Sequence, residues 1–151
     1  MFVVLILTSC SIPKRSQYHS PYGAFLPPTR PWKEIHSSKV ERVFSYPKRE
    51  AVIGYNSTCQ VSPPKSMGKL SQELFGNLGT LILLRKMDFV KDTIRGHEFV
   101  FEGGTAQTTF HLLTVVLNSN ECQYDFSMIT KPESFEEHRA TLMEMVDSFV
   151  N

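Results

Sequence analysis

Residues 105–130 constrain the fold of this chain more than any other part of its sequence. Residues 105–117 are rich in β-branched side chains, and residues 118–121 have the composition of a turn. The segment that follows alternates apolar with polar side chains, as a strand with one apolar face does. The apolar positions are Cys122, Tyr124, Phe126 and Met128, whereas Gln123, Asp125 and Ser127 share the opposite face, on which we expect Asp125 to be solvated. The pattern predicts a β-hairpin.

Shorter patterns on the N-terminal side of this hairpin predict further strands separated by turns. The predicted strands span residues 40–46, 51–55, 86–94 and 98–102, and the predicted turns or loops span residues 47–50, 62–68, 95–97 and 102–105. The last of these reads Glu-Gly-Gly-Thr. We interpret it as a plain turn, because the glycine patterns of phosphate-binding and dinucleotide-binding loops are absent.

Two helices are predicted, one on each side of the strand-rich middle. The first has Ser71 as its N-cap and an apolar stripe with three- and four-residue spacing, made of Leu70, Leu74, Leu78, Leu81 and Ile82. The second follows Pro132, begins with a capping box of Ser134 and Glu137, and runs to about Phe149. Its apolar stripe is Phe135, Leu142, Met145, Val146 and Phe149, with Glu136, Glu144 and Asp147 off the stripe. These elements predict an α+β fold, with an antiparallel β-sheet of about five to six strands and two main helices packed on it.

Composition narrows the class of protein. The chain has 151 residues, which suits a single domain, and 41% of them are apolar, including eleven Phe. That content is too high for a disordered chain. The formal net charge is +1, from 16 basic and 15 acidic residues, so we expect no nucleic-acid partner.

The first ten residues have the character of an export signal. Residues 1–7 carry no polar side chain, and this run is too short to span a bilayer, which takes about 20 apolar residues. No Lys or Arg precedes the run, and a start upstream of Met1 would account for that. The alternative interpretation is a buried N-terminal strand that ends in Cys10.

The junction Leu7-Thr8-Ser9-Cys10 resembles the lipobox of bacterial lipoproteins, in which an aliphatic residue and two small residues precede a cysteine. The resemblance implies a signal peptide over residues 1–9 and acyl chains, palmitate among them, on Cys10. Two or more acyl chains anchor a protein stably. Ser11 rather than Asp after the cysteine resembles an outer-membrane address. We therefore expect a lipid-anchored protein of the bacterial envelope, at the outer membrane, on its periplasmic or surface face.

Residues 10–31 form a predicted tether that joins the lipidated cysteine to a single domain over residues 32–151. The tether contains five prolines and lacks a helical or strand period, which favours an extended segment over a ligand-binding motif. Its aromatic residues leave open that part of it packs on the domain: Tyr18, Tyr22 and Phe25.

The order of the predicted elements over residues 40–150 resembles the PsbP-like fold, an α/β/α sandwich around an antiparallel sheet. An extrinsic photosystem subunit and a Ran-binding import factor share that fold. The resemblance rests on strands followed by a final hairpin and a closing helix that ends at Ser148-Phe149. It carries no functional residues over to this chain and implies no enzymatic activity.

Cys59 and Cys122 are a candidate disulfide pair. Export places the chain in an oxidising compartment, and assigning Cys10 to lipid leaves an even number of thiols. The alternatives are two separate buried thiols, or a catalytic thiol with a nearby histidine.

The histidines lack the spacing of a metal site. They are His19, His36, His97, His111 and His138, and no His-Glu-x-x-His motif occurs. We interpret His111 and His138 as packing or surface residues, and expect neither a metal nor a cofactor.

Three functions remain open. The sequence favours a non-catalytic envelope lipoprotein that binds a protein partner or assists a larger complex. The second is a module that binds a small ligand or lipid in a cleft between the sheet and a helix. The third is an enzyme, such as a thiol-dependent hydrolase.

Overall fold

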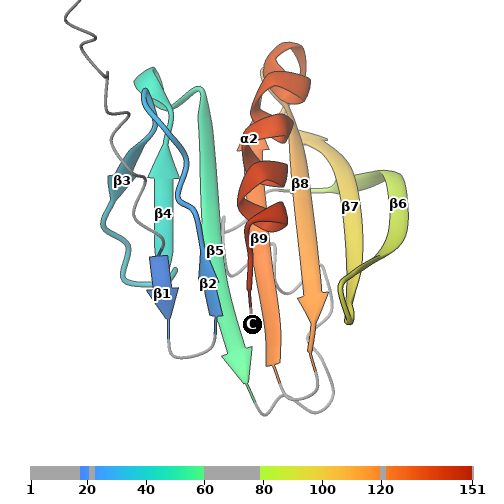
Figure 1. The fold of residues 1–151 in the computed structure, drawn as a ribbon. Helices are drawn as coiled ribbons and strands as arrows, with labels where there is room; N and C mark the ends of the chain where they lie inside the picture. The colour runs from blue at the N-terminus through green and yellow to red at the C-terminus, as the bar shows by residue number, and fades with distance from the viewer. Residues whose placement is uncertain (1–17, 21–22, 60–78, 120–121, 151) are drawn as a thin grey trace, which may run out of the picture.

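The computed structural model describes residues 18–20, 23–59, 79–119 and 122–150. A seven-stranded antiparallel sheet dominates them, with the order β3-β4-β5-β9-β8-β7-β6 (Figure 1). Its strands are β3 (Lys33–Ile35), β4 (Arg42–Ser45), β5 (Ala51–Cys59), β6 (Leu81–Lys91), β7 (Ile94–Gly104), β8 (Thr109–Asn118) and β9 (Cys122–Thr130). Two short N-terminal strands, β1 (Tyr18–Ser20) and β2 (Gly23–Phe25), form a separate pair. Two 3-10 turns, η1 (Pro47–Arg49) and η2 (Pro132–Ser134), and the helix α2 (Phe135–Asp147) complete the described elements.

The predicted hairpin of β8 and β9 is confirmed, and the antiparallel α+β class holds. The sheet has seven strands rather than five to six, and α2 is the one α-helix among the described residues. The first predicted helix lies mainly outside those residues, but Leu81 and Ile82 at its end belong to β6. Their helical spacing was misleading because Leu81 pairs with Gly103 in an antiparallel ladder, and sheet pairing overrides a local pattern.

The hairpin of β6 and β7 corrects two predicted turns. Residues 95–97 are strand, and the chain reverses instead at Asp92-Thr93, where Asp92 has a φ of 56°. Asp tolerates this left-handed conformation better than most residues. Residues 102–104 are strand as well, and the next reversal follows them at residues 105–108. Gly96 lies in β7 and pairs with Phe89, whose ring covers it. A side chain does not fit at this position, because a Cβ would lie 2.3 Å from that ring. The glycine marks a close approach rather than a turn.

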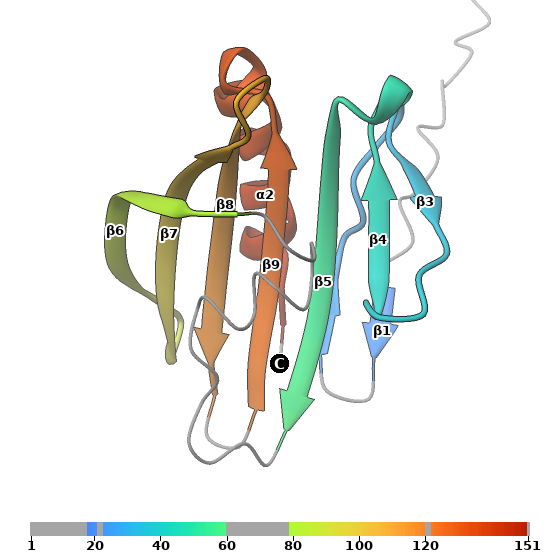
Figure 2. The same ribbon diagram turned by 180° about the vertical axis from the view of Figure 1, so that it is seen from behind.

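One face of the sheet packs against α2, which lies over β8 and β9 (Figures 1 and 2). The predicted helical stripe is buried there in full. Of the apolar residues predicted on β9, Tyr124, Phe126 and Met128 are buried and Cys122 is partly buried. Glu136, Glu144 and Asp147 are exposed, as predicted. The core of this layer includes Tyr55, Leu113, Val115, Tyr124, Phe126, Leu142, Met145 and Phe149.

The face of β9 that carries Gln123, Asp125 and Ser127 is buried as well, which corrects the expectation that Asp125 is solvated. Asp125 is 1% exposed and Gln123 is 5% exposed, and Ser127 is buried beside Thr114, to which its hydroxyl is 3.1 Å away. The alternation of apolar and polar residues therefore predicted correctly which β9 residues share a face, but it did not predict which face is exposed to solvent. A strand buried on both sides can still alternate when one side buries hydrogen-bonding groups.

The predicted capping box of α2 is wrong. The helix begins at the predicted place, but the Ser134 side chain makes no capping hydrogen bond. Ser134 ends η2 with φ −103° and ψ 6°, whereas a capping serine needs an extended backbone. Its backbone N–H instead donates to the carbonyl of Lys131 at 3.2 Å.

Residues 23–31, assigned to the tether from sequence, lie on the domain. Phe25 is fully buried in the core, and Ala24 exchanges two 2.8 Å backbone hydrogen bonds with Val150 beyond α2. The N–H of Leu26 also donates to the Ser148 hydroxyl at 2.8 Å. Within the described ranges, no helix is long and apolar enough to cross a membrane.

Candidate functional site

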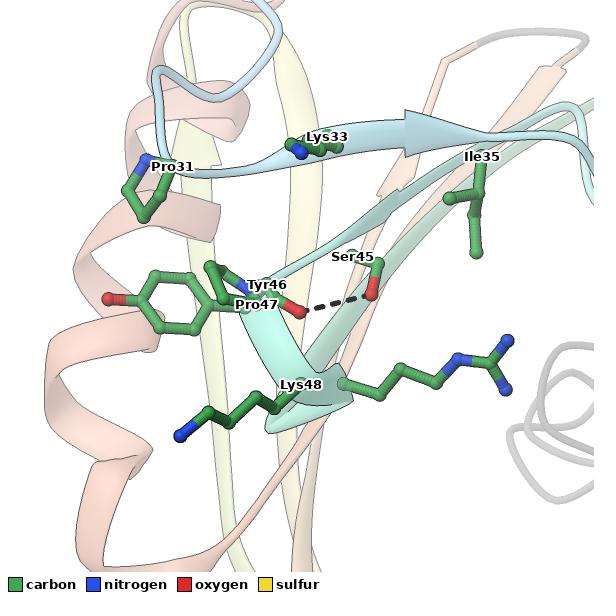
Figure 3. Close-up of a pocket in the computed structure, with 8 residues that line it drawn as sticks. Pro31, Lys33, Ile35, Ser45, Tyr46, Pro47 and Lys48 are labelled. Atoms are coloured by element: carbon green, nitrogen blue, oxygen red, sulfur yellow. Dashed lines mark hydrogen bonds between the residues drawn. The ribbon is translucent and has the colours of Figure 1, made fainter.

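A hollow that opens to solvent lies where β3 runs beside the turn between β4 and β5. Its first part, of about 370 Å³, lies between β3 and η1 (Figure 3). A second part, of about 750 Å³, adjoins it and shares Pro31, Lys33 and Pro47. We call the two parts together the basic hollow; its lining is Arg30, Pro31, Trp32, Lys33, Ile35, Ser45, Tyr46, Pro47, Lys48 and Arg49.

Strand pairing brings the two sides of the basic hollow together. Lys33 pairs with Ser45 and Ile35 pairs with Val43, so residues 30–35 lie alongside residues 45–49. Figure 3 shows Ile35 extending from β3 and the Tyr46 ring extending toward α2. The turn is closed by backbone hydrogen bonds from Tyr46 to Ala51 at 2.9 Å and from Arg49 to Tyr46 at 3.0 Å.

The backbone of η1 is strained at its two basic residues. Lys48 and Arg49 both have a φ of 56°, in the left-handed region that favours glycine. This conformation costs roughly 1–2 kcal/mol for each residue with a Cβ. Strained backbone of this kind is concentrated at functional sites. Both side chains are exposed at the turn.

Four basic side chains surround the hollow, and all four are exposed: Arg30, Lys33, Lys48 and Arg49. None of them takes part in the ion pairs found between described residues. Glu34, which is nearby in sequence, is instead 2.5 Å from Arg42. The hollow therefore combines positive charge with an apolar lining of proline, tryptophan, tyrosine and isoleucine.

Three rings support the hollow from behind. Trp32 is edge-on to Tyr46 and to His138 on α2, with ring centroids 5.3 Å apart in each pair, and Tyr46 lies 4.5 Å from His138. Burial lowers the pKa of His138, although the charges of Glu137 and Glu50 partly oppose this shift. His138 is therefore a packing residue, as predicted from sequence.

Cys59 and Cys122 are joined by a disulfide, as predicted. They occupy directly paired positions at the ends of β5 and β9, with their Cα atoms 4.0 Å apart. Neither sulfur is available as a nucleophile in this state. The third cysteine, Cys10, lies outside the described residues, as do the predicted signal peptide (residues 1–9) and residues 11–17 and 21–22 of the tether.

The other histidines with described side chains are dispersed. His97 hydrogen bonds to Asp88 at 2.8 Å, and His111 lies 3.4 Å from Glu102 and packs edge-on against Phe135. His36 is exposed. In the described part of the chain, no three His, Cys, Asp or Glu side chains come together as a metal site would require.

The sequence predicted the turn at residues 47–50 but not the basic hollow. Arg30 and Lys33 lie about fifteen residues before Lys48 and Arg49, and only the pairing of β3 with β4 makes them neighbours. One sequence pattern could have indicated the basic hollow. Proline stands next to basic residues in both segments that line it, Arg30-Pro31-Trp32-Lys33 and Pro47-Lys48-Arg49.

No protein-family model matches the sequence, and no curated protein matches it. The structure is similar to cyanobacterial PsbP (CyanoP) from Synechocystis sp. PCC 6803, with a TM-score of 0.68 and 14% identity over 95% of this chain and 98% of that one. A Bacteroides thetaiotaomicron protein gives a TM-score of 0.61 and 9% identity, over 89% of this chain and 47% of that one. A Pseudomonas aeruginosa protein of unknown function, PA94, gives 0.49 and 10%, over 90% and 96%. The chain thus has the PsbP-like fold, as its element order predicted; fold similarity does not carry function.

Proposed function

We propose that this protein is a membrane-anchored, non-catalytic lipoprotein of the bacterial envelope, which binds an acidic segment of a protein partner at the basic hollow. The observation that carries the proposal is the set of four exposed basic side chains around an apolar lining. Their charges are not neutralised by ion pairs to described residues. A partner with carboxylates would supply the opposite charge.

The lining favours an extended segment with rings or prolines between its carboxylates. Trp32 and Tyr46 offer amphipathic rings, and Pro31 and Pro47 offer rigid apolar surface. Aromatic residues and arginine are enriched at protein interfaces because they bury much area while keeping hydrogen bonds available. The hollow is therefore suited to a protein segment.

The anchoring part of the proposal rests on the lipobox-like junction at Cys10. Acyl chains on that cysteine would hold the protein at the outer membrane, on its periplasmic or surface face. Between Cys10 and Tyr18, where β1 pairs with β2, 8 residues (18 − 10) would span at most about 28 Å. The domain would then meet partners close to the membrane surface.

Two alternatives have less support. A ligand cleft between sheet and helix would need space under α2, where Phe126, Leu142 and Met145 are fully buried in one packed cluster. A thiol-dependent hydrolase would need a free Cys59 or Cys122, and these are bonded to each other.

The single tryptophan of the chain, Trp32, lies in the hollow and reports on its occupation. Full-length protein carrying Cys10→Ser would be titrated with a short peptide of alternating glutamate and proline. We expect a change in Trp32 emission that saturates and weakens as salt rises, because screening acts on exposed charges. A peptide of alternating lysine and proline is the charge control and should leave the emission unchanged.

The double variant Lys48→Ala/Arg49→Ala should weaken binding of the glutamate–proline peptide by about tenfold or more. The matched control is Lys39→Ala/Arg95→Ala, which removes two exposed basic residues outside the hollow. Equal binding by both double variants would remove the basic hollow as the binding site.

A further inference from the structure

The strand β6 has an unusual surface for the edge of a sheet. Five of the seven large apolar side chains that are exposed in the described residues belong to this strand: Ile82, Leu83, Leu84, Met87 and Val90. They are 44–69% exposed. The hairpin of β6 and β7 extends beyond α2, so the helix does not cover it (Figures 1 and 2). Apolar side chains on an uncovered edge strand indicate a surface that another strand covers.

β6 is the end strand of the described sheet, and it pairs with β7 along one side only. Pairing with a second copy of the same strand would have to be antiparallel and two-fold symmetric. The faces that carry α2 in the two copies would then lie on the same side of the joined sheet. The two-fold axis must then lie midway between one residue and its own counterpart, which pair with each other; an axis is named below by that residue. Only a few positions lie in the regular part of β6, after the irregularity between Leu83 and Arg85.

The charges of β6 distinguish between these positions. An axis at Arg85, Lys86 or Asp88 would place like charges directly opposite each other, which is destabilising. An axis at Met87 places the two exposed Met87 side chains together. It places Lys86 of each copy opposite Asp88 of the other copy, which gives two pairs of opposite charge. It also sets Arg85 against the Phe89 ring of the second copy. An axis at Phe89 would oppose Asp88 with Val90, and Met87 with Lys91, and its one charge pair, Lys86 with Asp92, would lie beyond the end of β6. An axis at Val90 would bring Asp88 against Asp92, and an axis at Lys91 would again oppose like charges.

We propose that the protein forms a homodimer through antiparallel pairing of β6 with β6 of a second copy, with the two-fold axis at Met87. The sheet then continues from one copy into the other, and the exposed apolar side chains of β6 are covered. The charged residues of β6 select this one register and disfavour the others. Isologous pairing of this kind closes on itself and does not extend into fibres.

The existing contacts of β6 are compatible with this arrangement. Arg85 donates to the buried carboxylate of Glu98 within the same copy, which keeps its side chain on the α2 side of the sheet. The hydrogen bond from His97 lowers the pKa of Asp88, so its carboxylate is charged. Lys86 is 4.0 Å from Asp88 of its own copy and lies over the Phe99 ring, and its side chain is half-exposed.

The first test is the molecular mass of the full chain carrying Cys10→Ser, measured by sedimentation over a range of concentrations. We expect a monomer–dimer equilibrium. Lys86→Asp and Asp88→Lys should each weaken dimerisation by at least about tenfold, because each creates two like-charge pairs. The double variant Lys86→Asp/Asp88→Lys should restore it. A monomer at every concentration, or two single variants that dimerise like the parent, would overturn the proposal.

The second test locates the axis and does not depend on charge. In the same Cys10→Ser chain, where Cys59 and Cys122 are bonded to each other, Met87→Cys would add one free thiol at the axis. Mild oxidation should then link two copies covalently. Val90→Cys is the matched control, since Val90 is 69% exposed on the same strand but would lie far from its own counterpart. Equal cross-linking of the two variants would exclude the Met87 axis, and circular dichroism would verify that each is folded.

Discussion

Arg139 on α2 donates hydrogen bonds to both carboxylate oxygens of Glu98 on β7, with its Nη2 atom 3.0 Å from Oε2 and 3.2 Å from Oε1. Glu98 is fully buried, and Arg85 on β6 contacts the same carboxylate from the other side. This network joins the helix to the β6–β7 hairpin, which extends beyond it. A buried carboxylate is tolerated only where such partners satisfy it.

Arg139→Met should lower the free energy of unfolding by about 2–3 kcal/mol, because Glu98 stays buried with one charged partner fewer. Arg85→Met should cost less, since the Arg85 side chain is 46% exposed and solvent already screens its charge. Urea denaturation measures both. Arg95→Met is the control, as Arg95 is exposed on the same hairpin, and we expect less than about 0.5 kcal/mol. Equal losses for Arg139→Met and Arg95→Met would contradict the role of the network.

Stability should fall at acidic pH through His138. Burial lowers the folded-state pKa of His138 from 6.5, with Glu137 and Glu50 partly opposing the shift. Between the folded-state and unfolded-state pKa values, the unfolded chain binds more protons, so stability rises with pH in this window. It is therefore lost as pH falls below about 6.5 and levels off below the folded-state pKa.

The variant His138→Phe should remove this part of the pH dependence, because phenylalanine keeps a ring against Trp32 and Tyr46 without a titrating group. Urea midpoints of the parent and the variant, compared between about pH 7.5 and about pH 5, measure the difference. His36→Asn, at an exposed position, should keep the parent's slope. An unchanged slope in His138→Phe would assign the acid sensitivity to other groups.

Removal of the disulfide should destabilise the domain without changing its fold. Cys59 and Cys122 are 63 residues apart in sequence, and in the chain-entropy model a bridge over such a loop contributes roughly 4 kcal/mol. We expect Cys59→Ala/Cys122→Ala to lower the unfolding midpoint by a corresponding amount, measured by urea denaturation. A reducing agent should reproduce the loss in the parent and have no effect on the double variant. If the reducing agent left the parent's midpoint unchanged, the bridge would not be stabilising the domain.

The lipid anchor predicts a difference in mass and in location. In its bacterial host, the parent should partition with the membrane fraction and show the added mass of acyl chains on Cys10. Cys10→Ser should leave that fraction and differ in mass from the unmodified chain by the substitution alone. Mass spectrometry and fractionation measure both properties. A Cys10→Ser variant that remained on the membrane would be evidence against lipid anchoring.

The sequence by itself determined the local elements that carry strong periodic patterns. The hairpin of β8 and β9 and the apolar stripe of α2 could be predicted because each pattern extends over more than two turns or several strand pairs. The bonding of Cys59 to Cys122 could be predicted from the expected oxidising compartment and from the even number of cysteines left once Cys10 is assigned to lipid. These features depend on short-range order or on simple chemistry.

Only the tertiary structure decided the rest. The sequence predicts a turn at Gly96, but the Phe89 ring on the neighbouring strand occupies the space of a Cβ there. The sequence predicts a solvated Asp125, but its side chain is buried. The basic hollow and the register of β6 both depend on which strands become neighbours. Pairing between strands distant in sequence is set by the packing of the whole sheet, and local patterns carry little information about it.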